Sequence, residues 1–295
     1  MYETDSSTRQ LRFAENWGWL LVFLVISSTL VIGDRFANYV WELGPATPVV
    51  EIHIGSILFS FALLALTVGF LHLEDVSLSD IGLGPKLLLP ALATIAAYFL
   101  LLNVIGISLG TVAGDPDTIG YQWSVPPLEA IYVFVFMFVV AGIVEEVVFR
   151  GYLQNKLIAM IPGASWSSIA FGIAIASVLF SAYHIPRVMF DGPPGTMTAE
   201  SYLLLLFVNG IGFGLLYEFT QNLYVPITVH AAGNMPGTAG ILFFNMGGWP
   251  SWAMALYVGS YLALIVLVII GYRRWASRNG AMPVWTERHS TPMTV

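Results

Sequence analysis

Long apolar runs separated by short polar segments dominate the chain. A helix needs about 20 apolar residues to cross a bilayer, and eight runs approach that length. They lie near Trp17–Ile32, Ile52–Leu73, Leu87–Leu109, Leu128–Phe149, Ser167–His184, Tyr202–Phe219, Leu223–Phe244 and Trp252–Tyr272. The pattern therefore predicts an all-α fold, a polytopic transmembrane helical bundle of about eight spans.

Composition places the chain in the same class. Apolar residues make up 57% of the 295 residues and charged residues only 10%, whereas soluble domains are about a quarter charged. The chain has no cysteine, which excludes disulfides, thiolate zinc ligands and a cysteine nucleophile. No basic patch indicates a nucleic-acid partner, so the expected partners are the lipid bilayer and a membrane-associated peptide or protein.

The distribution of Lys and Arg predicts the orientation. Cytoplasmic loops of membrane proteins are enriched in these residues. With the N-terminus inside, nine of them fall on the inner side and two, Arg35 and Arg187, on the outer side. We therefore expect an integral membrane protein, in the cell membrane, with both termini in the cytoplasm.

Two adjacent carboxylates interrupt the fourth run. Ionisable residues inside apolar helices are costly and usually face a cavity or the bundle interior, which indicates a function. Glu146 and Arg150 are four residues apart and share a helix face, so they form a natural ion pair. Glu145 is rotated by about 100° from Glu146 and has no local partner. We expect Glu146–Arg150 to be structural and Glu145 to be the reactive carboxylate.

Three further polar residues lie in the later runs. His184 ends the fifth run on the same face as Phe180, and His230 and Asn234 are four residues apart in the seventh. Taken alone, a histidine at a helix end such as His184 is more often interfacial than catalytic. The bland interpretation of His230 and Asn234 is an interhelical hydrogen-bond pair.

Together, these side chains permit two hydrolytic chemistries. Glu145, His184, His230 and Asn234 can activate a water and stabilise an oxyanion. Alternatively, Glu145, His184 and His230 can be three ligands of a catalytic zinc, although no His-Glu-x-x-His motif is present. A transporter with a proton relay and a non-catalytic immunity or scaffold protein remain rival interpretations.

Three motifs resemble the CAAX-protease and bacteriocin-processing family of intramembrane proteases, also called the Abi family. They read Glu145-Glu146-Val-Val-Phe-Arg150, Phe180-Ser-Ala-Tyr-His184 and His230-Ala-Ala-Gly-Asn234. The resemblance covers roughly Leu128 to Phe244. It divides the chain into residues 1–127, with the tail and three spans, a protease core at 128–245, and a last span and tail at 246–295.

The resemblance implies an eight-span fold and an endopeptidase acting within the membrane. By resemblance, Glu145 and His184 activate the water, and His230 and Asn234 form the oxyanion hole. The family carries the label metalloprotease, while its CAAX-processing members favour a glutamate-and-histidine mechanism without metal, so a zinc cofactor stays open. The substrate it implies is membrane-associated or lipidated.

One expectation concerns depth. If the fourth run ended at Phe149 on the inner side, Glu145 and His184 would lie near opposite membrane faces. About 18 helical residues rise about 27 Å, and the two side chains could not meet. We therefore expect the fourth helix to continue through Gly151–Ile161. We expect the fifth helix to tilt or to start late, and to break at Pro186, after His184.

Overall fold

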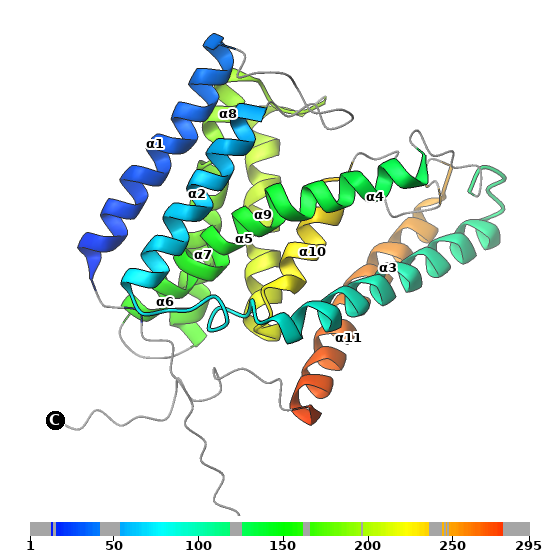
Figure 1. Ribbon diagram of the computed structural model, residues 1–295. Coiled ribbons are helices and arrows are strands. Elements are labelled where there is room, and N and C mark those ends of the chain that lie inside the picture. Colours follow the sequence, from blue (N-terminus) through cyan, green and yellow to red (C-terminus); the bar gives the residue numbers. More distant parts are fainter. Residues whose placement is uncertain are drawn as a thin grey trace, which may run out of the picture.

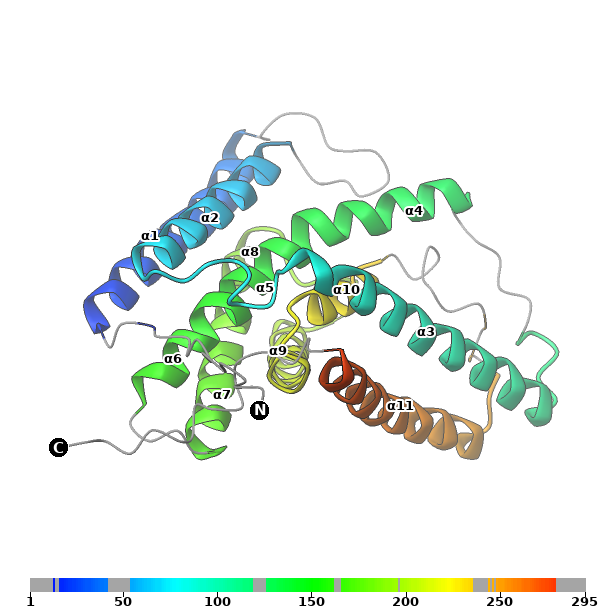
Figure 2. The same ribbon diagram turned by 60° about the horizontal axis from the view of Figure 1, so that its bottom comes forward.

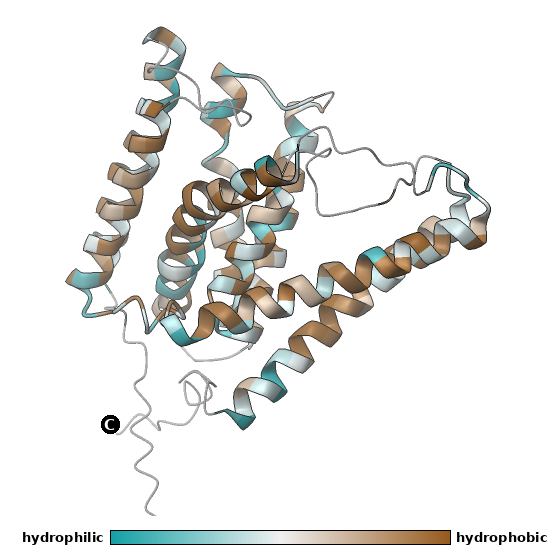
Figure 3. Ribbon diagram, turned by 45° about the vertical axis from the view of Figure 1, so that its right-hand side comes forward, coloured by the Kyte–Doolittle hydropathy of each residue, from teal (hydrophilic) through white to brown (hydrophobic). Residues whose placement is uncertain are grey.

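A computed structural model describes residues 13, 16–41, 54–118, 126–161, 166–195, 197–235, 244, 246 and 248–279, and every regular element among them is a helix. Seven of these helices are long and apolar enough to cross a membrane. Hydrophobic residues follow one another along most of these helices, and hydrophilic residues gather mainly at the helix ends (Figure 3). The all-α, polytopic fold predicted from the apolar runs is confirmed, and the chain is an integral membrane protein.

In chain order the elements are α1 (Trp17–Trp41), α2 (Ile54–Leu73), α3 (Pro85–Ala113), α4 (Pro127–Phe136), η1 (Met137–Ile143), α5 (Val144–Glu146), η2 (Val147–Gln154), α6 (Asn155–Met160), α7 (Trp166–Ala182), α8 (Ile185–Phe190), α9 (Ala199–Thr220), α10 (Tyr224–Gly233) and α11 (Ser251–Arg278). Several helices lie side by side in pairs, α1 with α2, α7 with α9, and α3 with α11 (Figures 1 and 2).

The seventh expected run, Leu223–Phe244, forms only the ten-residue helix α10 in its described part, and residues 236–243 lie outside the described residues. The chain nevertheless crosses the bundle here. Asn222, just before α10, donates hydrogen bonds to the Leu87 carbonyl oxygen and the Tyr272 hydroxyl, at the start of α3 and near the end of α11. Trp249, just before α11, donates to Thr118, beyond the end of α3. The two ends of this segment therefore lie at opposite ends of the bundle, and the start of α1 lies on the same side as the end of α11 (Figure 1).

We call the end of the bundle near Asn222 the floor end. The segment between α2 and α3 packs there: the backbone N–H of Leu223 donates to the Gly82 carbonyl oxygen, 3.2 Å away. Gly82 has φ of +85°, and a Cβ at this position would lie 2.6 Å from the Gln221 carbonyl oxygen. A glycine is therefore required at this close approach.

The fourth helix is longer than its strongest apolar run. It continues from α4 to Met160, as expected, and so places Glu145 near its middle. Two π-helical segments, η1 and η2, flank the single α-turn that carries Glu145 and Glu146. Such π-helical turns are rare and often occur at functional sites. The Asn155 side-chain amide donates to the carbonyl oxygens of Arg150 and Gly151, which supports the widened turn.

The fifth helix breaks beside its histidine. Helix α7 ends at Ala182, Tyr183 and His184 form a turn, and α8 begins at Ile185. The expected break is present, but it precedes His184 rather than following it. Pro186 lies in the first turn of α8, where its missing N–H costs no helical hydrogen bond. The turn leaves His184 at the junction of the two helices.

Close packing of α7 on α9 holds this region together. A Cβ at Gly210 would lie 2.9 Å from the Ser177 Cβ, and one at Gly214 would lie 2.9 Å from the Ile173 Cγ2. Small residues let helix backbones approach in a membrane, where no hydrophobic force drives helices together. The buried residues of α1, α2, α7 and α9 therefore pack around η2, in the fourth helix.

Candidate active site

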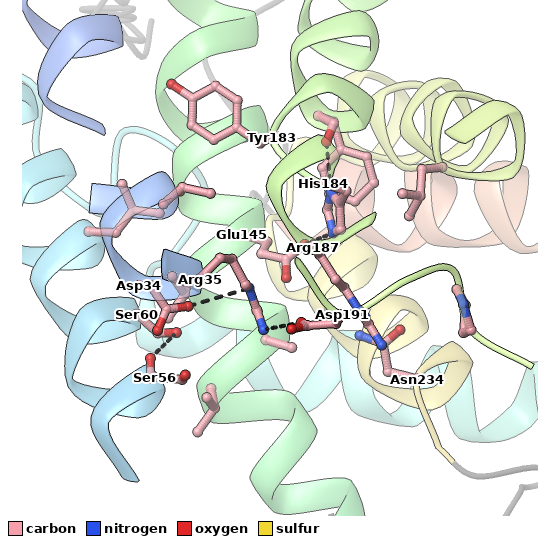
Figure 4. Close-up of a pocket in the computed structure, with 18 of the residues that line it drawn as sticks. Asp34, Arg35, Ser56, Ser60, Glu145, Tyr183, His184, Arg187, Asp191 and Asn234 are labelled. Atoms are coloured by element: carbon pink, nitrogen blue, oxygen red, sulfur yellow. Dashed lines mark hydrogen bonds and ion pairs between the residues drawn. The ribbon is translucent and has the colours of Figure 1, made fainter. Parts of the chain in front are cut away.

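The polar residues from the three motifs meet in a cavity of about 930 Å³. Helices α1, α2, α8 and α9, the middle of the fourth helix and the end of α10 line it. Figure 4 shows Glu145 facing His184 across this space, and Asn234, the residue after α10, farther away on the side of Asp191. Four of the six predicted site residues line the cavity, namely Glu145, His184, His230 and Asn234.

Glu145 stands between two imidazoles. Its Oε2 lies 3.9 Å from His184 Nε2 and 3.8 Å from His230 Nε2. The Glu145 side chain is 27% exposed, but its Oε2 is buried and has no hydrogen-bond partner among the described residues. These separations are too long for direct hydrogen bonds and short enough for a water to bridge Glu145 Oε2 to either imidazole at about 2.8 Å.

Hydrogen bonds fix the roles of the imidazole nitrogens. His184 Nδ1 lies 2.8 Å from the Phe180 carbonyl oxygen, which can only accept, so Nδ1 carries a proton. His230 Nδ1 lies 2.7 Å from Glu146 Oε1, which as a carboxylate also only accepts. Both rings are therefore held by Nδ1–H, and both turn Nε2 toward Glu145.

Glu146 and Arg150 form the predicted ion pair. Arg150 Nη1 lies 2.9 Å from Glu146 Oε1, and both side chains are at most 2% exposed. The guanidinium also donates to the Gly210 carbonyl oxygen and lies over the rings of Phe180 and Phe213, at 4.6 and 5.2 Å from their centroids. Cation–π contacts of a desolvated arginine stabilise it further. Arg150 thus ties the fourth helix to α7 and α9.

His230 and Asn234 occupy the end of α10. His230 is buried and its ring stacks on Phe213, with centroids 4.9 Å apart. Asn234 is the residue after the helix and is exposed in the cavity. Its backbone N–H donates to the His230 carbonyl oxygen, 3.0 Å away, which keeps the last turn closed.

The three donors do not form a zinc ligand set as they stand. Ligand atoms of a tetrahedral zinc with bonds of 2.0–2.1 Å lie about 3.3–3.4 Å apart. The two separations at Glu145 are 3.8 and 3.9 Å, and the described part of the chain contains no group of three His, Cys, Asp or Glu arranged to hold a metal. We therefore derive no chemical step through a metal.

Sequence reasoning missed a polar cluster at the other end of the cavity. Arg35 Nη1 lies 3.2 Å from Asp191 Oδ2, and Arg35 Nε lies 3.5 Å from Asp34 Oδ2 (Figure 4). Ser56 and Ser60 of α2 lie beside them. In the sequence, Asp34 and Arg35 appear only as a charged pair after the first apolar run. In the structure, helix α1 continues beyond them to Trp41 and so places them in the cavity wall.

A carboxylate and two oriented imidazoles in a cavity of a helical membrane protein define a candidate membrane-embedded hydrolytic centre. The comparisons agree with this class. Residues 127–236 match the family described as Rce1-like, Type II CAAX prenyl endopeptidase Rce1-like. The resemblance predicted from the three motifs is thus confirmed over the segment that holds them.

One curated relative adds a weaker likeness. The chain is 31% identical over 98 residues to a protein of Bacillus subtilis (strain 168) named uncharacterized protein YpbD. The match covers 32% of this chain and 39% of that protein, so the chain spans about two fifths of the length of this relative. No solved structure matches the chain.

Proposed function

We propose that this protein is an intramembrane endopeptidase of the CAAX prenyl protease type. It hydrolyses a peptide bond of a membrane-associated or lipidated substrate with a water activated by glutamate and histidine. The observation that carries the proposal is the position of Glu145 Oε2 between the Nε2 atoms of His184 and His230 in a cavity large enough for a peptide segment. The family of residues 127–236 supports the same reaction class.

In this mechanism, Glu145 is the general base. It removes one proton from the water, whose oxygen attacks the carbonyl carbon of the scissile bond. In this mechanism His184 is neutral, and because its Nδ1–H is committed to the Phe180 carbonyl oxygen, its Nε2 is the unprotonated nitrogen. It accepts a hydrogen bond from the other water proton and orients a lone pair toward the substrate.

His230 and Asn234 stabilise the oxyanion that forms on the carbonyl oxygen. Asn234 donates from its side-chain amide. His230 can donate from Nε2 only when both of its nitrogens are protonated, because Glu146 holds the Nδ1–H. The intermediate then collapses: the C–N bond breaks, and the proton held by Glu145 passes to the leaving amine nitrogen.

The charges of the cluster balance under this assignment. Glu145 and Glu146 carry two negative charges, and Arg150 and a protonated His230 carry two positive ones. A buried charge without a partner costs several kcal/mol, so a neutral set is the stable arrangement at this depth. Glu146 then has two tasks, since one oxygen contacts both Arg150 and His230.

The test is hydrolysis by the protein purified in detergent. A mixture of quenched fluorescent peptides is incubated with it in H₂¹⁸O, and the products are identified by mass spectrometry. The proposal predicts cleavage at internal bonds with ¹⁸O in the new carboxyl group. The matched control is Glu145→Gln, which keeps size and removes the base. Cleavage that does not exceed the level of this variant would overturn the proposal.

A further inference from the structure

A group of oxygen-bearing side chains lines the cavity on the side of α1 and α2. It consists of Asp34 and Asn38 on α1 and of Ser56 and Ser60 on α2, and we call these four residues the oxygen cluster. Glu145 lines the same cavity, but the proposed reaction uses no member of the cluster. The cluster therefore has no role in the chemistry described so far.

The packing of α1 against α2 brings the four residues together. A Cβ at Gly33 would lie 3.9 Å from Phe59 Cε1, and nearer the start of α1 the rings of Phe23 and Phe70 lie 5.3 Å apart between centroids. The two helices therefore run antiparallel, and the cluster residues that follow Gly33 on α1 lie at the level of those beside Phe59 on α2. Figure 4 shows three of the four residues side by side in the cavity wall.

Three oxygens of the cluster are buried without a hydrogen-bond partner among the described residues. They are Asp34 Oδ1, Asn38 Oδ1 and Ser56 Oγ, and the residues Asp34 and Ser56 are only 8% and 5% exposed. The fourth residue is satisfied, because Ser60 Oγ donates to the Ser56 carbonyl oxygen at 2.9 Å. Each buried polar group left unpaired costs about 1–3 kcal/mol. Three such oxygens in one wall favour a ligand that brings several hydrogen-bond donors.

The charges around the cluster favour a cationic ligand. Asp34 and Asp191 share one guanidinium, since Arg35 Nε lies 3.5 Å from Asp34 Oδ2 and Arg35 Nη1 lies 3.2 Å from Asp191 Oδ2. The other arginine of the cavity lining, Arg187, is held on α9: its guanidinium lies 5.8 Å from the centroid of the Tyr202 ring and donates to the hydroxyl at 3.3 Å. Asp34 thus has half a cation and one unpaired oxygen.

We infer that the oxygen cluster is a specificity subsite that binds a basic side chain of the peptide substrate. The ammonium group of a lysine has three N–H donors and no acceptor, which matches the three unpaired oxygens. Its aliphatic stem packs on apolar side chains of the same wall, such as Leu30 and Leu63. The inference rests on the proposed function for the reaction, whereas the cluster itself rests on burial and contacts. The preferred substrate is then a membrane-associated peptide with a basic residue near the scissile bond.

The test uses pairs of peptides that differ by one charge. A peptide that the detergent-purified protein cleaves is resynthesised with a single lysine at each position around the scissile bond. Its partner carries acetylated lysine there, which keeps the stem and removes the charge. At one position we expect kcat/KM to be about ten- to a hundredfold higher for lysine, mainly through KM, because charge-assisted hydrogen bonds form in a buried site. No advantage of lysine at any position would overturn the inference.

Substitutions then assign the preference to the cluster. The ratio of kcat/KM between the two peptides is measured within each variant, so it does not depend on how much of the variant is folded. Asp34→Asn should bring the ratio close to one, and Ser56→Ala, which does not touch Arg35, should lower it severalfold. Asp191→Asn removes the other carboxylate beside Arg35 and should keep the ratio. A ratio that survives Asp34→Asn, or that Asp191→Asn lowers equally, would overturn the assignment.

Two further outcomes are distinguished. Replacing sodium by choline in the buffer tests for a metal cation. If cleavage of both peptides then falls, and Asp34→Asn removes this dependence, the cluster holds a metal cation and the inference is wrong. If no peptide is cleaved at all, the proposed function fails, and binding of fluorescent lysine and acetyl-lysine peptides to the purified protein, followed by anisotropy, tests the subsite alone. Equal dissociation constants for the two peptides would overturn it.

Discussion

His230 Nδ1 lies 2.7 Å from Glu146 Oε1, the same oxygen that lies 2.9 Å from Arg150 Nη1. One buried carboxylate oxygen therefore joins the ion pair of the fourth helix to an imidazole of the candidate site. The spacing of Glu146 and Arg150 predicted the ion pair. It did not predict the contact with His230, because that contact joins residues 84 positions apart in the sequence.

Arg150→Ala should destabilise the protein strongly. It leaves Glu146 buried without its guanidinium partner, and breaking a buried pair in this way costs about 3–5 kcal/mol. Thermal unfolding in detergent should show a large drop in melting temperature. Arg274→Ala, an exposed arginine near the end of α11, is the control and should stay within about 0.5 kcal/mol of the wild type. Equal melting of both variants would contradict the structural role of Arg150.

Asn234→Ala should lower turnover far more than it changes KM. Removing one oxyanion donor costs about 10²–10³ in kcat, because the contact strengthens only in the transition state. The control is Asn209→Ala, which removes another exposed amide from the wall of the same cavity and should keep the kcat of the wild type. The measurement is the kcat and KM of both variants on a peptide that the wild type cleaves. A normal kcat for Asn234→Ala would remove this residue from the mechanism.

Lys156→Met should affect stability without a direct effect on the chemistry. Lys156 is fully buried against Glu74, which follows the end of α2. Its loss leaves a buried carboxylate without this cation, which costs about 3–5 kcal/mol. We expect a lower melting temperature and an unchanged kcat per folded molecule at a temperature where the variant is folded. A folded variant with a kcat reduced tenfold or more would show that this ion pair acts on the site.

A chelator should leave activity unchanged. The Oε2 and Nε2 atoms around Glu145 are spaced for a water rather than for a tetrahedral zinc. The purified protein is assayed before and after treatment with a strong chelator, with metal content measured on the same samples. Loss of activity that added zinc restores would contradict the water-only mechanism and support Glu145, His184 and His230 as ligands.

Helical periodicity in the sequence predicted part of this site. Helical spacing separates Glu145 from Glu146, and only Glu146 has an arginine four residues on, so the two carboxylates could be given different expectations. The structure places Glu145 on the cavity wall and Glu146 in the core, and the roles given to the two residues stay predictions. The expected meeting of Glu145 and His184 is also present, since their polar atoms lie 3.9 Å apart.

Other features could not be read from the sequence. The apolar run around α10 continues past Gly233, so it predicts a full span where the described helix has ten residues. The break at Tyr183 and His184 precedes Pro186, because a proline in the first turn of a helix fits the helix rather than ending it. The polar cluster of Asp34, Arg35 and Asp191 depends on contacts between α1 and the segment after α8, which no local pattern records.

The most direct test of the account compares two isosteric substitutions, Glu145→Gln and Glu146→Gln, by thermal unfolding in detergent and by peptide hydrolysis. Glu145 contributes no ion pair to Arg150, so Glu145→Gln should melt close to the wild type and hydrolyse no peptide above background. Glu146→Gln weakens the contacts to both Arg150 and His230, so its melting temperature should fall together with its activity. An active Glu145→Gln beside a Glu146→Gln that is stably folded and inactive would show that Glu146, not Glu145, activates the water.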